Sequence, residues 1–255
     1  MTARKSLFIL MACTALVASS CGSDESSDDS PAAVDPTEAT GGDTVADTDT
    51  DTDTADGVAG DTVADADAVA SDPECPPLEG TSEQLQTFDA PPPMCLDPNA
   101  SYQALVVTNK GEFTIDLDQD KAPETTNSFV FLARNQYFDN TVCHRIIPGF
   151  VVQCGDPTAT GTGGPGYTII DEPPAAGEYQ IGSIAMANTG APNSGGSQFF
   201  IITGEQGAAL PPQYSLFGEV IDGFDGTVVS MEAAGTATGD PSEPIEIQSI
   251  TIIQP

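Results

Sequence analysis

The stretch CHRIIPGFVVQCGD, residues 143–156, constrains the fold of this chain more than any other segment. Two short β-type runs flank the turn-forming pair Pro148-Gly149, a pattern that predicts a β-hairpin. If Arg145 and Gln153 share one face of that hairpin, a guanidinium and an amide lie side by side next to apolar side chains. The same stretch holds the only histidine, one of six basic residues and two of six cysteines.

The rest of the region after residue 100 has the pattern of a mainly β domain. The run SIAMANTGAPNSGGSQFFIIT at 183–203 predicts two strands around a loop rich in Gly, Asn and Ser, and its adjacent phenylalanines predict one core and one pocket side chain. We expect two helices, at 123–136 and 224–233, because the first has Pro in its first turn and apolar residues along one side. Many short strands with few helices predict a barrel or a sandwich. The expected strands are 102–108, 112–117, 143–147, 150–154, 167–170, 183–187, 198–203, 214–221 and 245–253.

Together these runs resemble the cyclophilins, a family of peptidyl-prolyl cis–trans isomerases. The strings HRIIPGF…Q.GD and MAN…GSQFFI are family signatures in the family's order, and GEFTIDL, KAPETTNSFVFLA, GTGGPGY and SLFGEVIDG match as well. The resemblance extends from about residue 102 to 253. It implies an eight-stranded antiparallel barrel with two capping helices, which would act on Xaa-Pro peptide bonds (EC 5.2.1.8).

Rotation about an Xaa-Pro bond is slow because the amide loses its resonance, at a barrier of about 18–20 kcal/mol. A catalyst needs an apolar pocket that binds proline and a hydrogen-bond donor that stabilises the twisted bond. We therefore expect no cofactor and no metal. The resemblance makes Arg145 that donor and Gln153 the residue that orients it. His144 is expected to be structural, because the reaction needs no general base. The residues implied to bind substrate are Phe150, Val151, Ala187, Asn188, Phe200, Leu210 and Tyr214.

Three positions depart from the family pattern around the expected proline pocket. Val151 stands where Met is usual, Tyr214 where many members have His, and Ala209 where a rim Trp is usual. A second function therefore stays open, namely a proline-peptide binding module or chaperone with little or no turnover.

The amino-terminal part has the pattern of an exported protein. Residues 1–20 combine a basic start with a short apolar run and resemble a bacterial lipoprotein signal, so Cys21 is expected to carry lipid. A lipid site at Cys13, or a secretory signal with an incidental cysteine, remain alternatives. We expect a monomer that is anchored by lipid on the outer face of the bacterial membrane or in the periplasm, and that assists the folding of exported proline-containing polypeptides.

An acidic segment follows the signal. The formal net charge is −33, and residues 22–74 hold 17 acidic and no basic residues. Low complexity and like charge predict that 21–74 is a disordered linker. Residues 75–100 are rich in Pro and are expected to form a strap on a domain at 101–255. With four bases among 22 acids after residue 74, the domain has no basic face for nucleic acid.

Four cysteines remain after the signal and the lipid site, and their number alone allows three connectivities. The predicted hairpin brings Cys143 nearly opposite Cys154, and most cyclophilins have Phe and Gly at these positions. This departure favours a bond between the two, which leaves Cys75 and Cys95 as the other pair. The alternative is that Cys143 is a small buried apolar residue.

Overall fold

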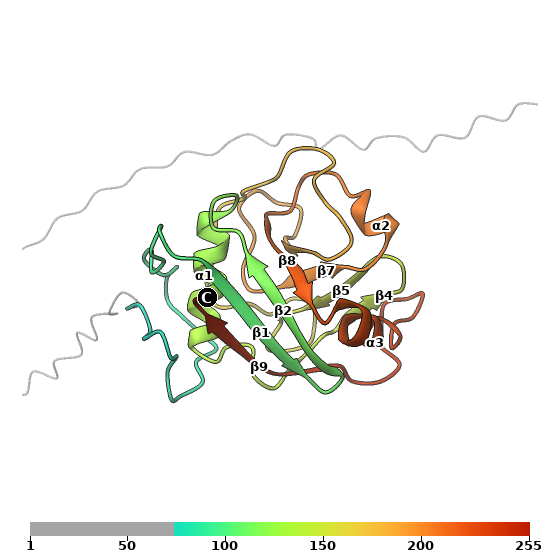
Figure 1. The fold of residues 1–255 in the computed structure, drawn as a ribbon, viewed down its shortest axis with the longest axis horizontal. Helices are drawn as coiled ribbons and strands as arrows, with labels where there is room; N and C mark the ends of the chain where they lie inside the picture. The colour runs from blue at the N-terminus through green and yellow to red at the C-terminus, as the bar shows by residue number, and fades with distance from the viewer. Residues whose placement is uncertain (1–73) are drawn as a thin grey trace, which may run out of the picture. The chain divides into compact units, whose positions relative to one another are not determined.

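The computed structural model describes residues 74–255 of the chain (Figure 1). The predicted signal peptide, the predicted lipid site at Cys21 and the predicted linker up to residue 73 lie outside the described residues. No helix in the described part is long and apolar enough to cross a lipid bilayer.

The described part is built mainly from short strands. Its elements are β1 (Tyr102–Thr108), β2 (Gly111–Leu117), α1 (Pro123–Arg134), β3 (Thr141–Val142), β4 (Arg145–Ile147), β5 (Val151–Cys154), β6 (Ser183–Met186), β7 (Phe199–Ile202), α2 (Glu205–Ala208), β8 (Leu216–Asp222), the π-helical turn η1 (Phe224–Val228), α3 (Val229–Glu232) and β9 (Glu246–Ile253).

All of these strands belong to one antiparallel sheet in the order β3-β9-β1-β2-β8-β6-β7-β5-β4. The two edge strands are consecutive parts of one segment, residues 141–147. Thr141 at its start pairs with Ile247 of β9, and Arg145 near its end pairs with Gln153 of β5. The sheet therefore curls back on itself through this kinked segment. When β3 and β4 are counted as one strand, the predicted eight-stranded barrel is confirmed.

Two sequence predictions differ from the structure in detail. The strand predicted at 167–170 is wrong, because only an isolated bridge between Ile169 and Gly195 forms there. Gly166 before the run and Pro173 after it limit the backbone pairing that a strand needs. The predicted second helix is a π-helical turn followed by α3, and the short α2 was not predicted.

The interior of the barrel is filled by alternate residues of its strands and closed by α1. Along β1 every second side chain is buried, the pattern of a strand with one face toward a core. Phe129 of α1 packs edge-on against Phe199 of β7, with ring centroids 5.5 Å apart, and also contacts Phe138 and Phe217. These fully buried rings join the helix to the sheet.

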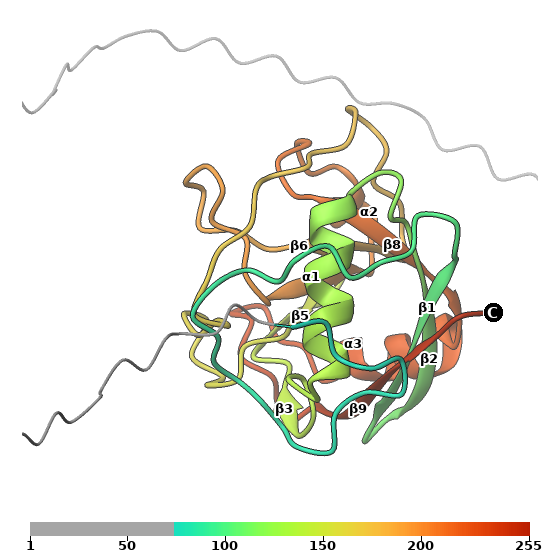
Figure 2. The same ribbon diagram turned by 90° about the vertical axis from the view of Figure 1, so that its left-hand side faces the viewer.

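Helix α1 is buried on all sides from Thr125 to Arg134, although its sequence is partly polar. Residues 75–100, the strap, run across it without forming a helix or strand (Figure 2). Asn127 of α1 donates to Pro93 O at 2.9 Å and accepts from Cys95 N at 2.7 Å. The strap thus supplies the partners that buried polar groups require.

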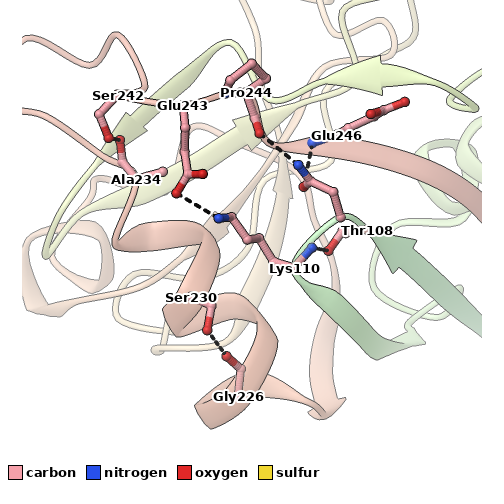
Figure 3. A network of polar contacts seen from close by, with 10 residues as sticks. Thr108, Lys110, Gly226, Ser230, Ala234, Ser242, Glu243, Pro244 and Glu246 are labelled. Carbon is pink, nitrogen blue, oxygen red and sulfur yellow. Dashed lines mark hydrogen bonds and ion pairs between the residues drawn. The ribbon is translucent and has the colours of Figure 1, made fainter.

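The turn between β1 and β2 is fixed to the segment that leads into β9 (Figure 3). Asn109 Nδ2 donates to Pro244 O at 2.9 Å, and Asn109 Oδ1 accepts from Glu246 N at 3.0 Å. Lys110 Nζ lies 2.7 Å from Glu243 Oε1. These contacts join neighbouring strands β1 and β9 at one end of the barrel.

Two disulfides are present among residues 74–255, and both have the predicted pairing. Cys75–Cys95 closes the strap, and Cys143–Cys154 joins the residue two before β4 to the last residue of β5. Cys143 and Cys154 are buried in the main core, whereas Cys75 is exposed. Because disulfides persist in oxidising compartments, the two bonds indicate an extracytoplasmic location.

Candidate active site

The register of four neighbouring strands brings the predicted site residues into one row. Arg145 of β4 lies opposite Gln153 of β5, Gln153 opposite Phe200 of β7, and Phe200 opposite Ala185 of β6. Side chains alternate between the faces of a sheet, so these residues share one face. The preceding residue of β7, Phe199, points the other way into the barrel core. The row therefore lies on the outer face of the barrel, and Phe199 and Phe200 lie on opposite faces of β7, as alternation along a strand predicts.

An apolar cluster, separate from the barrel core, surrounds the middle of this row. Its buried members are Val151, Tyr179, Ala185, Phe200, Ile202 and Leu216, and packed against them are Phe150, Ala187, Ala208, Leu210 and Tyr214. The ring of Phe200 meets Tyr214 edge-on at 5.3 Å. The structure thus gathers six of the predicted substrate residues in one patch: Phe150, Val151, Ala187, Phe200, Leu210 and Tyr214.

Arg145 lies at the edge of this cluster, partly exposed. Its Nη1 donates to Gln153 Oε1 at 3.3 Å, and its Cζ lies 5.5 Å from the centre of the Phe150 ring, within range of a cation–π contact. Among residues 74–255, no carboxylate lies within ion-pair distance of Arg145, whereas Lys110 and Lys121 each have one. The guanidinium therefore keeps donors for a bound molecule.

A chain of amides connects Gln153 to a neighbouring loop. Gln153 Nε2 donates to Gln198 Oε1 at 2.9 Å, and Gln198 Nε2 donates to Gly163 O at 3.0 Å. Each amide has its oxygen engaged by the preceding donor, which fixes the orientation of both side chains. Gln198 belongs to the motif GSQFFI, but its role was not predicted from the sequence.

Asp156, which is 0% exposed, binds the loop that contains Gly163 through its carboxylate. Its Oδ1 accepts from the Thr158 amide and hydroxyl, both at 2.7 Å, and its Oδ2 accepts from Gly161 N at 2.6 Å and Gly163 N at 3.0 Å. Burial alone would raise the pKa of Asp156, but these hydrogen bonds outweigh burial and lower the pKa below its ordinary value. A Cβ at Gly163 would collide with this carboxylate, so the loop requires glycine there.

A cleft of about 350 Å³ opens beside the apolar cluster, between the loop at 161–168 and the loop at 187–198. Ala187 lines the cleft and also packs against the cluster, and Gln153, which pairs with Phe200 of the cluster, lines the cleft as well. Asn188, the remaining predicted substrate residue, lies here rather than in the cluster. Its Nδ2 donates to Gln213 O at 2.9 Å, and its Oδ1 accepts from Gly190 N at 3.1 Å. The walls are mostly backbone and short polar side chains, which suit an extended peptide.

Tyr179 is a further site residue that the sequence analysis missed. It is buried in the apolar cluster, and its hydroxyl donates to Tyr214 O at 2.6 Å and accepts from Tyr214 N at 3.0 Å. Burial raises the pKa of Tyr179, which keeps the hydroxyl a neutral donor. Tyr179 thus fixes the backbone that carries the rim residue Tyr214. It lies in an irregular segment outside the quoted motifs, so no sequence pattern marked it.

Three other features of the described part do not form a proline site. His144 is partly buried beside Arg145 and Asp156, and burial lowers its pKa despite the nearby carboxylate. Within 74–255, no group of three or more His, Cys, Asp or Glu side chains could hold a metal ion. A larger cavity of about 580 Å³ lies by Asp116 and Asp118, but its polar, acidic walls offer no apolar grip for a proline ring.

Comparisons with known proteins agree with this geometry. The sequence model of the family "Cyclophilin type peptidyl-prolyl cis-trans isomerase/CLD" matches residues 104–252. Peptidyl-prolyl cis-trans isomerase A of Mycobacterium tuberculosis is 39% identical over 175 residues, which cover 61% of this chain and 94% of that protein.

Solved structures give the same answer. A crystal structure of a Cryptosporidium parvum cyclophilin type peptidyl-prolyl cis-trans isomerase aligns with a TM-score of 0.55 at 32% identity, covering 61% of this chain and 99% of that one. A second crystal structure of that protein, in the presence of the dipeptide Ala-Pro, aligns with a TM-score of 0.54 at 33% identity, covering 60% and 99%. The family match spans more than half of the sequence, and the chain belongs to the cyclophilin-type peptidyl-prolyl cis–trans isomerases (EC 5.2.1.8).

Proposed function

We propose that the site catalyses cis–trans isomerisation of Xaa-Pro bonds. The apolar cluster binds the proline ring while Arg145 donates a hydrogen bond to the amide as it twists. The observation that carries this proposal is the cross-strand pair of Arg145 and Gln153 at the edge of an outward-facing apolar patch. The crystal structure of the Cryptosporidium relative in the presence of the dipeptide Ala-Pro supports a proline-containing ligand for this chain as well.

The chemistry follows from the electronic change in the amide. As the Xaa-Pro bond twists, the lone pair that was shared with the carbonyl returns to the prolyl nitrogen, which then accepts a hydrogen bond. A guanidinium always carries its charge and presents several rigid donors, so Arg145 stabilises the twisted state more than the planar one. Gln153 holds Arg145 on one side and is itself held by Gln198. No covalent intermediate is needed.

The test replaces Arg145 with Ala and measures isomerisation of an Xaa-Pro peptide. Loss of one positioned donor should lower kcat/KM by about 10²–10³-fold with little change in thermal stability. Lys121→Ala, which removes a partly exposed cation elsewhere, is the matched control and should keep parent activity. Equal rates for parent and Arg145→Ala would overturn the assignment. If the parent protein binds Ala-Pro peptides but does not catalyse their isomerisation, the domain is a binding module instead.

We infer further that the protein acts on exported polypeptides and is anchored by lipid at Cys21. Support comes from the basic and apolar start of the sequence, the small residues before Cys21 and the two disulfides of the domain. A prolyl isomerase in that compartment would speed the slow proline-limited steps of folding.

Mass spectrometry of the membrane fraction tests the anchor. The expected amino terminus is a diacylglyceryl cysteine at position 21, and Cys21→Ser should release the protein from membranes. A Cys21→Ser form that still fractionates with membranes would contradict the anchor, as would a mature protein that starts at another residue.

A further inference from the structure

We propose that the strap, through Phe88, sets how strongly the enzyme favours extended peptides over a bare Xaa-Pro unit. The strap does so by holding the loop at 161–167, which forms one wall of the cleft beside the proline cluster. The inference rests on the proposed function, because it assigns the residues before proline to that cleft. The strap precedes the family match, which begins at residue 104, so the family model does not describe this support.

The first contact is between backbones. Phe88 N donates to Pro165 O at 2.8 Å. The next residue, Gly166, has φ of 97°, and a Cβ there would collide with Phe88 O. The strap and the loop therefore pack backbone against backbone at Gly166, where only a residue without a Cβ fits. Pro165 is buried and lines the cleft, so the strap contacts the back of the cleft wall.

The second contact is aromatic. The Phe88 ring meets Phe131 of α1 at 4.9 Å and Tyr167 at 6.3 Å, both edge-on. Tyr167 is buried, lines the cleft, and shares a 2.9 Å hydrogen bond with Ser128 of α1. Phe88 thus fills the space between the rigid helix and the cleft wall, where a smaller side chain would leave a void.

The wall that Phe88 supports is coupled to the catalytic pair. Gly163 O, in the same loop, accepts from Gln198, which in turn accepts from Gln153. This loop forms no β-strand, and the nearest strand-type pairing is the single bridge between Ile169 and Gly195. The position of the loop therefore depends on Asp156 and Gln198 at Gly163, and on the strap and Ser128 at Pro165 and Tyr167. Losing the strap contact should widen the cleft before it disturbs Arg145, because Asp156 still holds the part nearest Gln153.

The test compares two substrates with the same core, a blocked Ala-Pro dipeptide and the same dipeptide extended on its amino side. Rates come from exchange NMR, because a coupling protease could cut a loosened strap. For the full chain, kcat/KM should be higher for the extended peptide. Phe88→Ala should lower that advantage by about tenfold, through KM, because displaced cleft residues bind the extension less well. Activity on the dipeptide should stay at the parent value.

Gln84→Ala is the matched control. Gln84 lies in the same strap but donates to Gln136 O and Asp139 O, away from the cleft, so the substrate ratio should not change. If Phe88→Ala does not fold, the double variant Cys75→Ser/Cys95→Ser removes the covalent closure of the strap, keeps the Phe88 ring, and should shift the ratio in the same direction.

The outcomes separate the two proposals. A parent inactive on both peptides contradicts the proposed function. A parent that is active but shows no preference for the extended peptide overturns the inference alone. The inference also fails if Phe88→Ala lowers both rates equally, or if it changes only the melting temperature.

Discussion

The buried carboxylate of Asp156 offers the sharpest test of how the site is held together. In Asp156→Asn, the amide oxygen can still accept from Thr158. The amide nitrogen, however, is a donor, and it would face the N–H groups of Gly161 and Gly163. Two hydrogen bonds to a charged acceptor are therefore lost.

Hydrogen bonds to charged groups contribute about 1.5–3 kcal/mol each when buried. Gly161 is exposed, so water can replace part of what its N–H loses. The variant should thus be destabilised by about 2–3 kcal/mol, which for a folded unit of this size corresponds to a melting temperature about 4–12 °C lower. Activity should fall as well, because Gly163 O orients Gln198 and, through it, Gln153.

The effect should depend on pH in a defined direction. The pKa of Asp156 is lowered in the folded chain, so its contribution to stability is complete above the ordinary value of 3.8 and is lost as the pH falls through the folded value. Calorimetry of parent and Asp156→Asn should show a constant difference at neutral pH that shrinks below about pH 4. Asp120→Asn, which removes the same charge from an exposed side chain with no hydrogen bond in the described part, is the control. Equal melting temperatures for the two variants at neutral pH would refute the reasoning.

Further predictions concern the cysteines and the histidine. Replacing Cys143 and Cys154 with Ser should destabilise the protein by about 3 kcal/mol, because their bond closes a loop of about a dozen residues; equal unfolding curves would contradict this. Mild reductant should open Cys75–Cys95 first, since Cys75 is exposed and the other pair is buried; alkylation and peptide mapping decide the order. Burial lowers the pKa of His144 in the folded state. As the pH falls, His144 is therefore protonated in the unfolded state before it is protonated in the folded state, so the free energy of unfolding should fall from pH 7 to pH 5. In His144→Gln that fall should be smaller while turnover persists, and an unchanged pH dependence would count against it.

The sequence predicted most of the fold because its signals were local. The hairpin around Pro148-Gly149 set the pairing of Arg145 with Gln153, and alternation within the strands placed Phe199 and Phe200 on opposite faces. The run at 167–170 had the composition of a strand, yet a strand also needs a partner, and only Gly195 supplies one bridge.

The parts of the site that could not be predicted depend on contacts between distant segments. Phe88 lies almost eighty residues before Tyr167, and nothing in either local pattern indicates that they meet. Tyr179 binds a backbone 35 residues away. Such contacts follow from the folded path of the chain, which composition and periodicity do not specify.

The disulfide of the strap has a mechanical consequence. Tension applied to the chain before Cys75 enters the folded unit at that residue. The disulfide to Cys95 transmits this force from Cys75 directly to Cys95 and on toward β1. The loop of residues 76–94 therefore bears none of the force. Phe88 lies within that bypassed loop. While the bond is intact, a pull on the amino-terminal side is therefore not transmitted through the strap to the cleft wall, and reduction would place Phe88 directly in the line of force.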